Sequence, residues 1–282
     1  MDNLKAKKRH PEEIAVYTAI YVCAAFSVLL LLGIIIYVFA KGARRVNWAF
    51  LTGVTSILHG TVGIAGNILN TLIIILLTMI ITTPIGVGAA IYLNEYAKPG
   101  KLVTVIIFAT ETLAIIFGLF GMLFFGQLCH MGYSLLTGSL TLTLMVLPLV
   151  TRNTQEALKT VPDSFRTGAV GLGAGKWYTI RTILLPSAMP GIVTGVILAI
   201  GRIIGESAAL LFTAGSAHLL PKTFNAFLEK IFHSGGTLTI QLYLSASKGE
   251  FEVAFGIAVV LLVIVLLINF GTKRLAKKLE KH

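Results

Sequence analysis

Long apolar runs separated by short polar segments dominate this chain. Each run approaches the roughly 20 residues that an α-helix needs to cross about 30 Å of hydrocarbon, where only helices and closed barrels satisfy their own backbone hydrogen bonds. The pattern therefore predicts an all-α, polytopic membrane protein. We expect six transmembrane helices, at residues 16–39, 69–93, 102–125, 132–150, 189–212 and 253–270.

The polar segments between these runs differ in length and character. We expect a tail at 1–15, an outer loop at 40–68 with an amphipathic segment around Trp48 and Phe50, and a basic tail at 273–282. The longest inside connection covers 152–187, and an outer loop of similar length covers 214–249. The second to sixth helices and their connections form one predicted transmembrane domain at 69–272.

Composition and charge support this interpretation and predict an orientation. The chain is 56% hydrophobic and 12% charged, with a mean hydropathy of +0.87. Lys and Arg beside a span resist translocation. With both termini in the cytoplasm, sixteen of the 23 basic residues lie inside. The net charge of +11 is thus a topology signal, and we do not interpret it as nucleic-acid binding.

Six basic residues lie outside in this arrangement, and three of them that are close together are the chief exception to the charge rule. Lys41, Arg44 and Arg45 follow the first apolar run, on the side predicted to be outside. Two explanations are open: the cations cap the outer end of the first helix, or they belong to the amphipathic segment beside Trp48.

No arrangement of catalytic or metal-ligating residues is evident. The six histidines are scattered, without the i, i+3 or i, i+4 spacing of a metal site on one helix face. The cluster from Gly171 to Lys176 lacks the spacing of a nucleotide-binding loop, and Trp177 stands where such a loop has Ser or Thr. We therefore expect no catalytic residues, no metal and no cofactor, so any energy must come from a gradient or another subunit. Cys23 and Cys129 are expected to stay unpaired.

The connection at 152–187 is polar and punctuated by glycine. We predict one short helix at 154–160 and, after Pro162, a second from Asp163 to about Gly171, capped by Asp163 or Ser164. Gly171, Gly173 and Gly175 can end the second helix and turn the chain. Phe165 or Leu172 is the expected apolar contact with another protein; the alternative is a linker that only packs helices.

The spacing of Ala169, Gly173, Ile183 and Leu185-Pro186 resembles the cytoplasmic loop of ATP-binding-cassette (ABC) importer permeases. Thr167 and Gly168 replace the usual Glu and first Ala, which weakens any expectation of an ion pair there. The resemblance implies a type I ABC importer permease fold and a coupling helix that docks into an ATPase subunit. The residues it assigns to this coupling are Asp163, Phe165, Arg166, Thr167, Gly168, Ala169, Leu172, Gly173, Leu185 and Pro186.

Further motifs resemble one branch, the phosphate transport permeases of the PstA type. They are Asn67–Thr71, Pro84–Ala97, Gly118–Gly121, Thr151–Leu158 and Gly201–Ala208. This resemblance implies a prokaryotic plasma-membrane subunit without ATPase activity of its own. Its partners would be two ATPase subunits, a homologous second permease of the PstC type and an extracytoplasmic phosphate-binding protein.

The third run departs from that family. Phosphate permeases carry a Gly-x-Pro-Ser turn there, whereas here Thr112-Leu113-Ala114 continues directly into Ile115. A loss of four residues rotates the remaining helix by about 40° and shortens it by about 6 Å. Natural divergence, a deletion variant and a gap in the recorded sequence each account for it.

Charged residues in the apolar runs indicate an anion pathway. Arg202 lies inside the fifth run, where an unpaired guanidinium costs about 3 kcal/mol, and such residues are usually functional. Glu206 follows at i+4 spacing, and Arg152 ends the fourth run. Arginine binds phosphate oxygens with a bidentate fork. We expect Arg202, Glu206 and Arg152 to belong to the phosphate pathway, with Glu206 holding Arg202 in place while the site is empty and easing release of the anion. The alternatives are a purely structural Arg202–Glu206 pair and a membrane anchor at Arg152; the resemblance favours both arginines.

These observations together predict a permease subunit of an ATP-driven phosphate importer. Two other classes stay open: a permease for another oxyanion such as molybdate or sulfate, and a membrane-embedded sensor or scaffold that does not transport.

Overall fold

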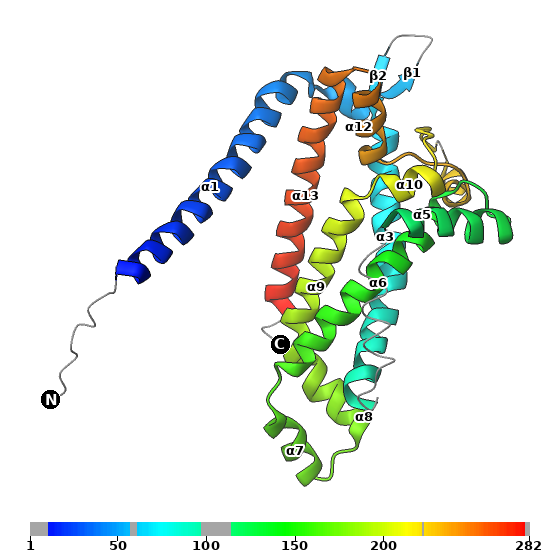
Figure 1. Cartoon of the computed structure of the whole chain (residues 1–282). Coiled ribbons are helices and arrows are strands. Elements are labelled where there is room, and N and C mark those ends of the chain that lie inside the picture. The colour runs from blue at the N-terminus through cyan, green and yellow to red at the C-terminus, as the bar shows by residue number, and fades with distance from the viewer. Residues whose placement is uncertain (1–10, 57–60, 97–113, 222, 280–282) are drawn as a thin grey trace.

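The structure is a computed structural model that describes residues 11–56, 61–96, 114–221 and 223–279. Helices make up most of it, which confirms the all-α prediction (Figure 1). Its main helices, in chain order, are α1 (Pro11–Gly42), α2 (Trp48–Thr52), α3 (Ala65–Ile91), α5 (Ala114–Gly121), α6 (Leu135–Lys159), α7 (Asp163–Gly171), α8 (Lys176–Thr179), α9 (Leu185–Gly205), α10 (Ala208–Thr213), α11 (Phe224–Glu229), α12 (Leu238–Ser247) and α13 (Phe251–Leu279).

Short elements connect or extend these helices. The 3-10 turns are η1 (Ala43–Arg45) and η5 (Lys230–Phe232), and the π-helical turns are η2 (Tyr92–Tyr96), η3 (Met122–Leu128) and η4 (Ile180–Leu184). Strands β1 (Val54–Ser56) and β2 (Thr61–Ile64) pair antiparallel, with Val54 opposite Ile64.

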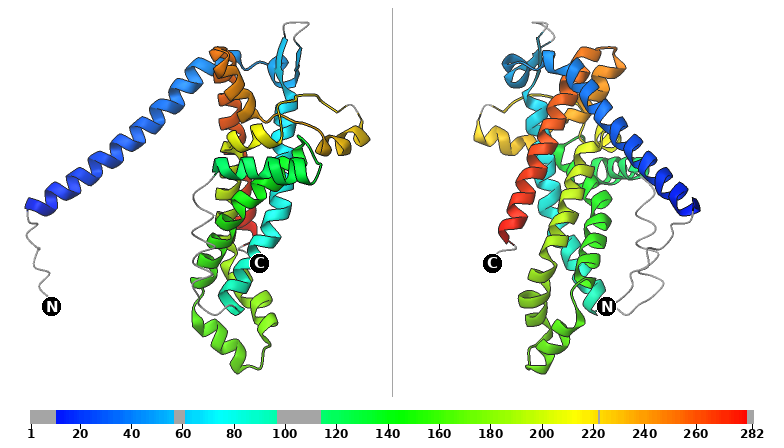
Figure 2. Two further views of the ribbon diagram at one scale, coloured as in Figure 1. Left: turned by 45° about the vertical axis from the view of Figure 1, so that its right-hand side comes forward. Right: turned by 90° about the vertical axis from the view of Figure 1, so that its left-hand side faces the viewer.

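Five helical segments in the described ranges are long and apolar enough to cross a membrane. They are Val16–Arg45, Ala65–Tyr96, Leu135–Lys159, Lys176–Gly205 and Phe251–Arg274. Five of the six predicted spans are thereby confirmed as long apolar helices. Half of the remaining one, predicted at 102–125, lies outside the described residues, together with Thr112 and Leu113 at the four-residue departure. Its described end forms α5 and η3, which run across the other helices (Figures 1 and 2).

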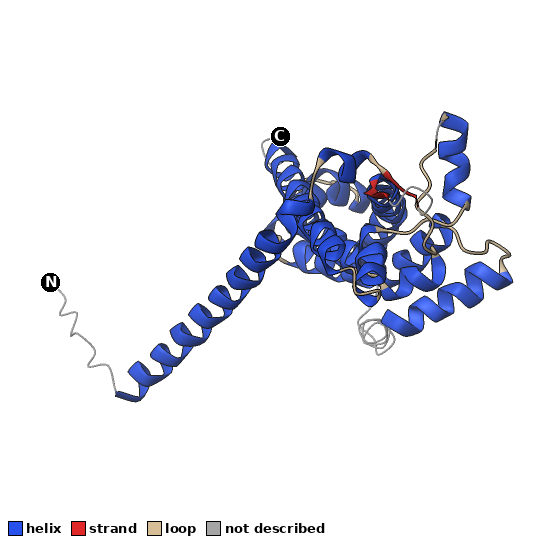
Figure 3. Ribbon diagram, turned by 90° about the horizontal axis from the view of Figure 1, so that it is seen from above, coloured by secondary structure: helices blue, strands red, loops and turns tan. Residues whose placement is uncertain are grey.

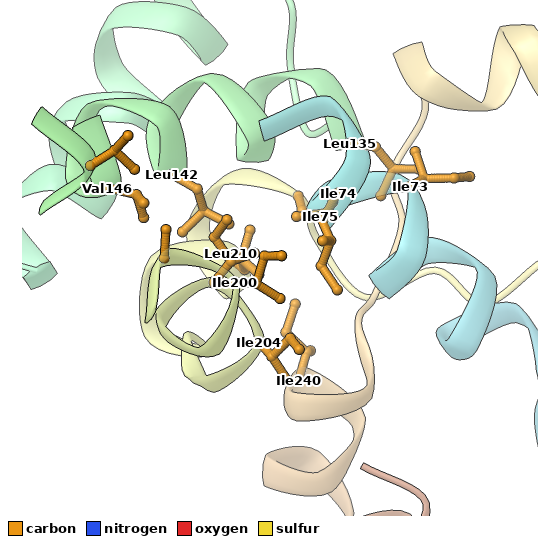
Figure 4. Packing of buried hydrophobic residues seen from close by; sticks show 14 residues of the cluster. Ile73, Ile74, Ile75, Leu135, Leu142, Val146, Ile200, Ile204, Leu210 and Ile240 are labelled. Carbon is orange, nitrogen blue, oxygen red and sulfur yellow. The ribbon is translucent and has the colours of Figure 1, made fainter. Parts of the chain in front are cut away.

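The core forms where α3, α6 and α9 pack side by side. Three consecutive isoleucines of α3, Ile73 to Ile75, share one buried cluster with Leu142 and Val146 of α6 and Ile200 and Ile204 of α9 (Figure 4). Close approach of α9 to α6 depends on glycine: a Cβ at Gly191 would lie 2.5 Å from the Ala157 Cβ. Burial of this apolar surface fixes the orientation of the three helices.

The predicted boundaries of the fourth and fifth spans differ from the structure. Helix α6 continues without a break to Lys159, so the separate short helix predicted at 154–160 does not exist. Its last turns pack Leu158 among buried residues of the α8–α9 segment, and this contact keeps them helical. The fifth span is divided, because α9 ends at Gly205, Glu206 is extended (φ −84°, ψ 118°), and α10 starts at Ala208.

Helix α1 stands apart from the bundle. Figures 1, 2 and 3 show it diverging from α13 along most of its length. The two helices meet near the end of α1, where the Tyr37 and Phe255 rings pack edge to face at 5.6 Å. A Cβ at Gly42 would lie 2.2 Å from the Phe255 carbonyl oxygen, so this contact needs glycine.

Buried amides fasten the outer loop onto α3. The Asn67 and Asn70 side chains both donate to the Gly236 carbonyl at 3.0 Å, and the Thr71 hydroxyl accepts from the Leu238 N–H at 3.0 Å. In the same loop the Lys230 ammonium donates to the Leu219 carbonyl, and burial lowers the pKa of Lys230 below its ordinary value. The loop at 214–249 is therefore a structured cap on the bundle.

Candidate functional site

Helix α7 forms the tip of the molecule farthest from β1 and β2 (Figure 1). Its bounds, Asp163–Gly171, match the sequence prediction. The turn after it needs Gly173, whose φ of +79° places it in the left-handed region. The N–H groups of Gly173 and Ala174 then close the helix end on the Val170 and Ala169 carbonyls.

The predicted side-chain cap of α7 is wrong. Pro162 occupies the N-cap position, and no side chain caps the first turn. The Asp163 carboxylate instead accepts a hydrogen bond from the Arg166 Nη1 at 2.9 Å. Proline suits this position because it has no N–H, and at the start of a helix that group has no intrahelical acceptor.

Arg166 connects α7 with two other helices. Its Nη2 donates to the Glu95 carboxylate of η2 and to the Leu158 carbonyl of α6, both at 3.1 Å, and its Nη1 also donates to the Val161 carbonyl. The Glu95 side chain is only 10% exposed and that of Arg166 23%, whereas that of Asp163 is 91% exposed. Arg166 therefore holds the tip in place from within the chain.

Lys176 adds a second link to the same segment of α3 and η2. Its ammonium donates to the Glu95 carbonyl and lies 4.3 Å from the centre of the Tyr96 ring. Ammonium groups are attracted to aromatic faces at such distances. Helix α7, through Arg166, and the start of α8, through Lys176, are thus both joined to η2.

The outer face of the tip is apolar and open. Phe165 and Val170 of α7 are exposed, and Leu172, directly after it, is 91% exposed. No atom of the described chain would lie within 4 Å of a Cβ at Gly168 or Gly171. An exposed apolar group of this kind at the end of a membrane protein is typical of a contact with another protein.

The other residues assigned to coupling lie elsewhere on the loop. Ala169 is buried against the chain itself, and the Thr167 hydroxyl bonds to the carbonyls of its own helix. Leu185 and Pro186 begin α9, where Leu185 packs on the buried cluster around Leu158. Ala169 and Leu185 thus support the tip from within, whereas Thr167 and Pro186 are exposed.

Arg202 lies in the last turn of α9 with its side chain exposed. It continues an exposed stripe of α9 that also contains Thr194, Leu198, Gly201 and Gly205. No atom of the described chain would approach a Cβ at Gly201 or Gly205 within 4 Å. This side of α9 is not covered by the described parts of the chain.

The expected i, i+4 arrangement of Arg202 and Glu206 is not formed. The helix ends between them, and among the described residues no ion pair joins them. The Glu206 carboxylate accepts from the Ala209 N–H at 3.2 Å at the start of α10, and its carbonyl accepts from the Thr239 hydroxyl at 3.2 Å. Glu206 thus stabilises the break between α9 and α10.

Arg152 is exposed on α6, where its Nε donates to the Glu156 carboxylate at 3.3 Å. Its neighbour Asn153 packs against Gly195 of α9, so that α6 and α9 meet directly beside Arg152. Such an exposed ion pair contributes little to stability.

Two residues of the tip were missed by the sequence analysis. Glu95 belongs to a motif that carries the resemblance, but it received no role, and Lys176 was counted only as an inside charge. A lone carboxylate directly after a long apolar run, facing a basic loop on the same side, is the signal that could have identified Glu95.

Comparison with known proteins agrees with this geometry. Residues 82–282 match the family model described as binding-protein-dependent transport system inner membrane component. The chain is 35% identical over 273 residues to the probable ABC transporter permease protein YqgI of Bacillus subtilis (strain 168), covering 92% of this chain and 93% of the relative. It is 34% identical over 246 residues to the phosphate transport system permease protein PstA of Xylella fastidiosa (strain Temecula1 / ATCC 700964), covering 84% and 82%.

Two solved structures have a similar fold. A chain of the bacterial alginate ABC transporter in complex with an alginate pentasaccharide-bound periplasmic protein superimposes with a TM-score of 0.70 at 15% identity, covering 96% of each chain. A chain of the inward-facing MetNI methionine ABC transporter gives a TM-score of 0.59 at 21% identity, covering 77% of this chain and 94% of that one.

The chain therefore belongs to the binding-protein-dependent transport system inner membrane components, the permeases of ABC importers. Within them it is of the PstA type.

Proposed function

We propose that this chain is the permease subunit of an ATP-driven phosphate importer. It forms half of the translocation pathway with a homologous second permease of the PstC type, and α7 docks into an ATPase subunit that hydrolyses the ATP. An extracytoplasmic phosphate-binding protein delivers the substrate. Several relatives named as phosphate transport permeases support the choice of substrate.

The observation that carries the proposal is the apolar tip at α7. Its exposed Phe165, Val170 and Leu172 suit insertion into a cleft of another protein, while Arg166 and Lys176 join the tip to η2 and α6. A force applied to the tip is therefore transmitted directly to α6 and, through η2, to α3.

The arrangement of the chain supports an orientation. The start of α1, the end of α13 and α7 point toward one end of the molecule, and β1, β2 and α12 lie at the other (Figure 1). Since most basic residues of the described ranges lie toward the first end, we place both termini and α7 in the cytoplasm and the cap at 214–249 outside, facing the binding protein.

Leu172→Asp tests the coupling in vesicles that contain the complete assembly. A charge on the tip disfavours its burial in an apolar cleft, so phosphate uptake and binding-protein-stimulated ATP hydrolysis should both fall at least about tenfold. Leu172→Met keeps the apolar contact and should retain both. Normal uptake and hydrolysis by Leu172→Asp would rule out docking through this tip.

Anion competition tests the substrate in the same vesicles. An excess of unlabelled phosphate should abolish uptake of labelled phosphate, whereas sulfate and molybdate at the same concentration should leave it unchanged. Stronger competition by either of these anions would assign the permease to another oxyanion, and failure to accumulate any of them would favour a sensor or scaffold.

A further inference from the structure

Three adjacent cations at the end of α1 are the chief exception to the charge distribution predicted from the sequence, and the structure gathers them in one cavity. Lys41, Arg44 and Arg45 line a cavity of about 910 Å³ between the α1–η1 corner and the start of α13. Its remaining lining residues are Tyr37, Ala40, Phe251, Glu252 and Phe255. The cavity thus combines a cationic end with aromatic walls.

Close packing builds this corner. Gly42 sits directly on the Phe255 carbonyl, and the Arg45 stem packs against Gly256, where a Cβ would meet the Arg45 Cγ at 3.2 Å. Phe50 of α2 is buried beside the same glycine. Contacts of Gly42 and Arg45 with α13 therefore fix the backbone of the corner that carries the three cations.

The charges in the cavity are not balanced by the described chain. Glu252 is the one carboxylate among the lining residues, and in the ranges that the structure covers no ion pair within 4 Å joins it to any of the three cations. The charge rule predicts few Lys and Arg residues on the outer side of a membrane protein. The three cations in this cavity therefore need another explanation. An anionic ligand supplies that explanation.

The shape below the cavity identifies the kind of anion. Figures 1 and 2 show α1 and α13, two apolar helices, converging near η1 and diverging away from it; the angle between them is called the wedge. The facing side of α1 is exposed along most of that length. A molecule that fills this site has an anionic head at the vertex and hydrocarbon chains in the wedge.

We propose that this cavity binds an anionic phospholipid. Its phosphodiester lies among Lys41, Arg44 and Arg45, and its acyl chains lie against Tyr37, Phe251 and Phe255 and continue between α1 and α13. Lysine ammonium and arginine guanidinium groups are the usual protein partners of lipid phosphates at a membrane surface. The bound lipid fixes the angle between α1 and the bundle. This site does not depend on the proposed transport of phosphate.

Native mass spectrometry of the full chain, purified with its co-purifying subunits in mild detergent, tests the proposal. Phosphatidylglycerol should remain bound more strongly than phosphatidylcholine. Each cation removed should weaken its retention about fivefold, so Lys41→Gln/Arg44→Gln should lower it about 25-fold. Lys41→Arg keeps the charge and should retain the lipid. Lys248→Gln removes an exposed cation at the same end of the molecule, outside the cavity, and should also retain it.

Further arms separate the lipid from other occupants. Millimolar inorganic phosphate should not displace phosphatidylglycerol; displacement that depends on Lys41 and Arg44 would assign the site to free phosphate. Equal retention by the double variant would overturn the proposal. So would equal binding of phosphatidylcholine, or loss of the lipid whenever a second permease is present. Unchanged assembly of the double variant by gel filtration shows that it is folded.

Discussion

At the scale of single residues, the structure separates two charges that the sequence pairs. Glu206 caps α10 through the Ala209 N–H, and Arg202 is exposed at the end of α9 without an ion pair in the described ranges. Arg202 is thereby available to an anion from outside the chain. An intramembrane arginine in this state favours a role in the pathway over a structural one.

Arg202→Gln should reduce phosphate uptake by about tenfold to a hundredfold, because hydrogen bonds to a charged group contribute about 1.5–3 kcal/mol. ATP hydrolysis by the assembly should continue, since the tip at α7 is unchanged. Glu206→Gln is the matched control: it keeps an acceptor for the Ala209 N–H and should keep uptake near normal. Near-normal uptake by Arg202→Gln would remove Arg202 from the pathway.

At the scale of elements, the position of α7 depends on one arginine with several partners. The Arg166–Glu95 contact is mostly buried and joins α7 to η2, whereas the Arg166–Asp163 contact is largely solvent-exposed and lies within α7. Exposed ion pairs contribute little, but removal of one partner from a buried pair leaves a charge without compensation. The two contacts therefore differ in importance although they share one side chain.

A double-mutant cycle with Glu95→Gln and Arg166→Gln should give a coupling free energy on the order of 1 kcal/mol in unfolding of the detergent-solubilised protein. The corresponding cycle with Asp163→Asn should give no measurable coupling. In vesicles, Arg166→Gln should lower the number of phosphate ions imported per ATP hydrolysed, because the tip then moves without α3. Equal coupling in both cycles would contradict the assignment of Glu95 as the anchor.

At the scale of the whole molecule, glycines distinguish the side of α9 that faces its own bundle from the side that does not. Gly191 and Gly195 lie against Ala157 and Asn153 of α6, whereas Gly201 and Gly205 meet nothing in the described chain. Small residues at the interfaces between membrane helices allow close backbone contact. The exposed stripe with Arg202 is therefore the side on which we expect the second permease.

Gly201→Leu should leave the unfolding temperature of the isolated chain unchanged, because the added side chain meets no atom there, but it should weaken assembly with the second permease. Gly191→Leu should instead lower the unfolding temperature of the isolated chain, because the added side chain clashes with Ala157 of α6. Both effects can be measured by thermal unfolding in detergent and by co-purification. Intact assembly of Gly201→Leu would place the partner elsewhere.

Much of the fold follows from local pattern. The positions of the long apolar helices are readable because solvation by lipid selects runs of about 20 apolar residues. The bounds of α7 are equally local, since Pro162 starts the helix and Gly173 ends it in a left-handed turn. The exposed Leu172 belongs to the same local pattern.

The sequence by itself thus determined the class of protein, its apolar helices and the helix at the tip, because these depend on neighbours along the chain. Only the tertiary structure decided that Arg166 turns inward to Glu95, 71 residues away, that Glu206 caps α10, and that Lys41, Arg44 and Arg45 share one cavity. Such contacts depend on how helices pack against each other, and a single sequence carries no measure of distance between segments that are far apart along it.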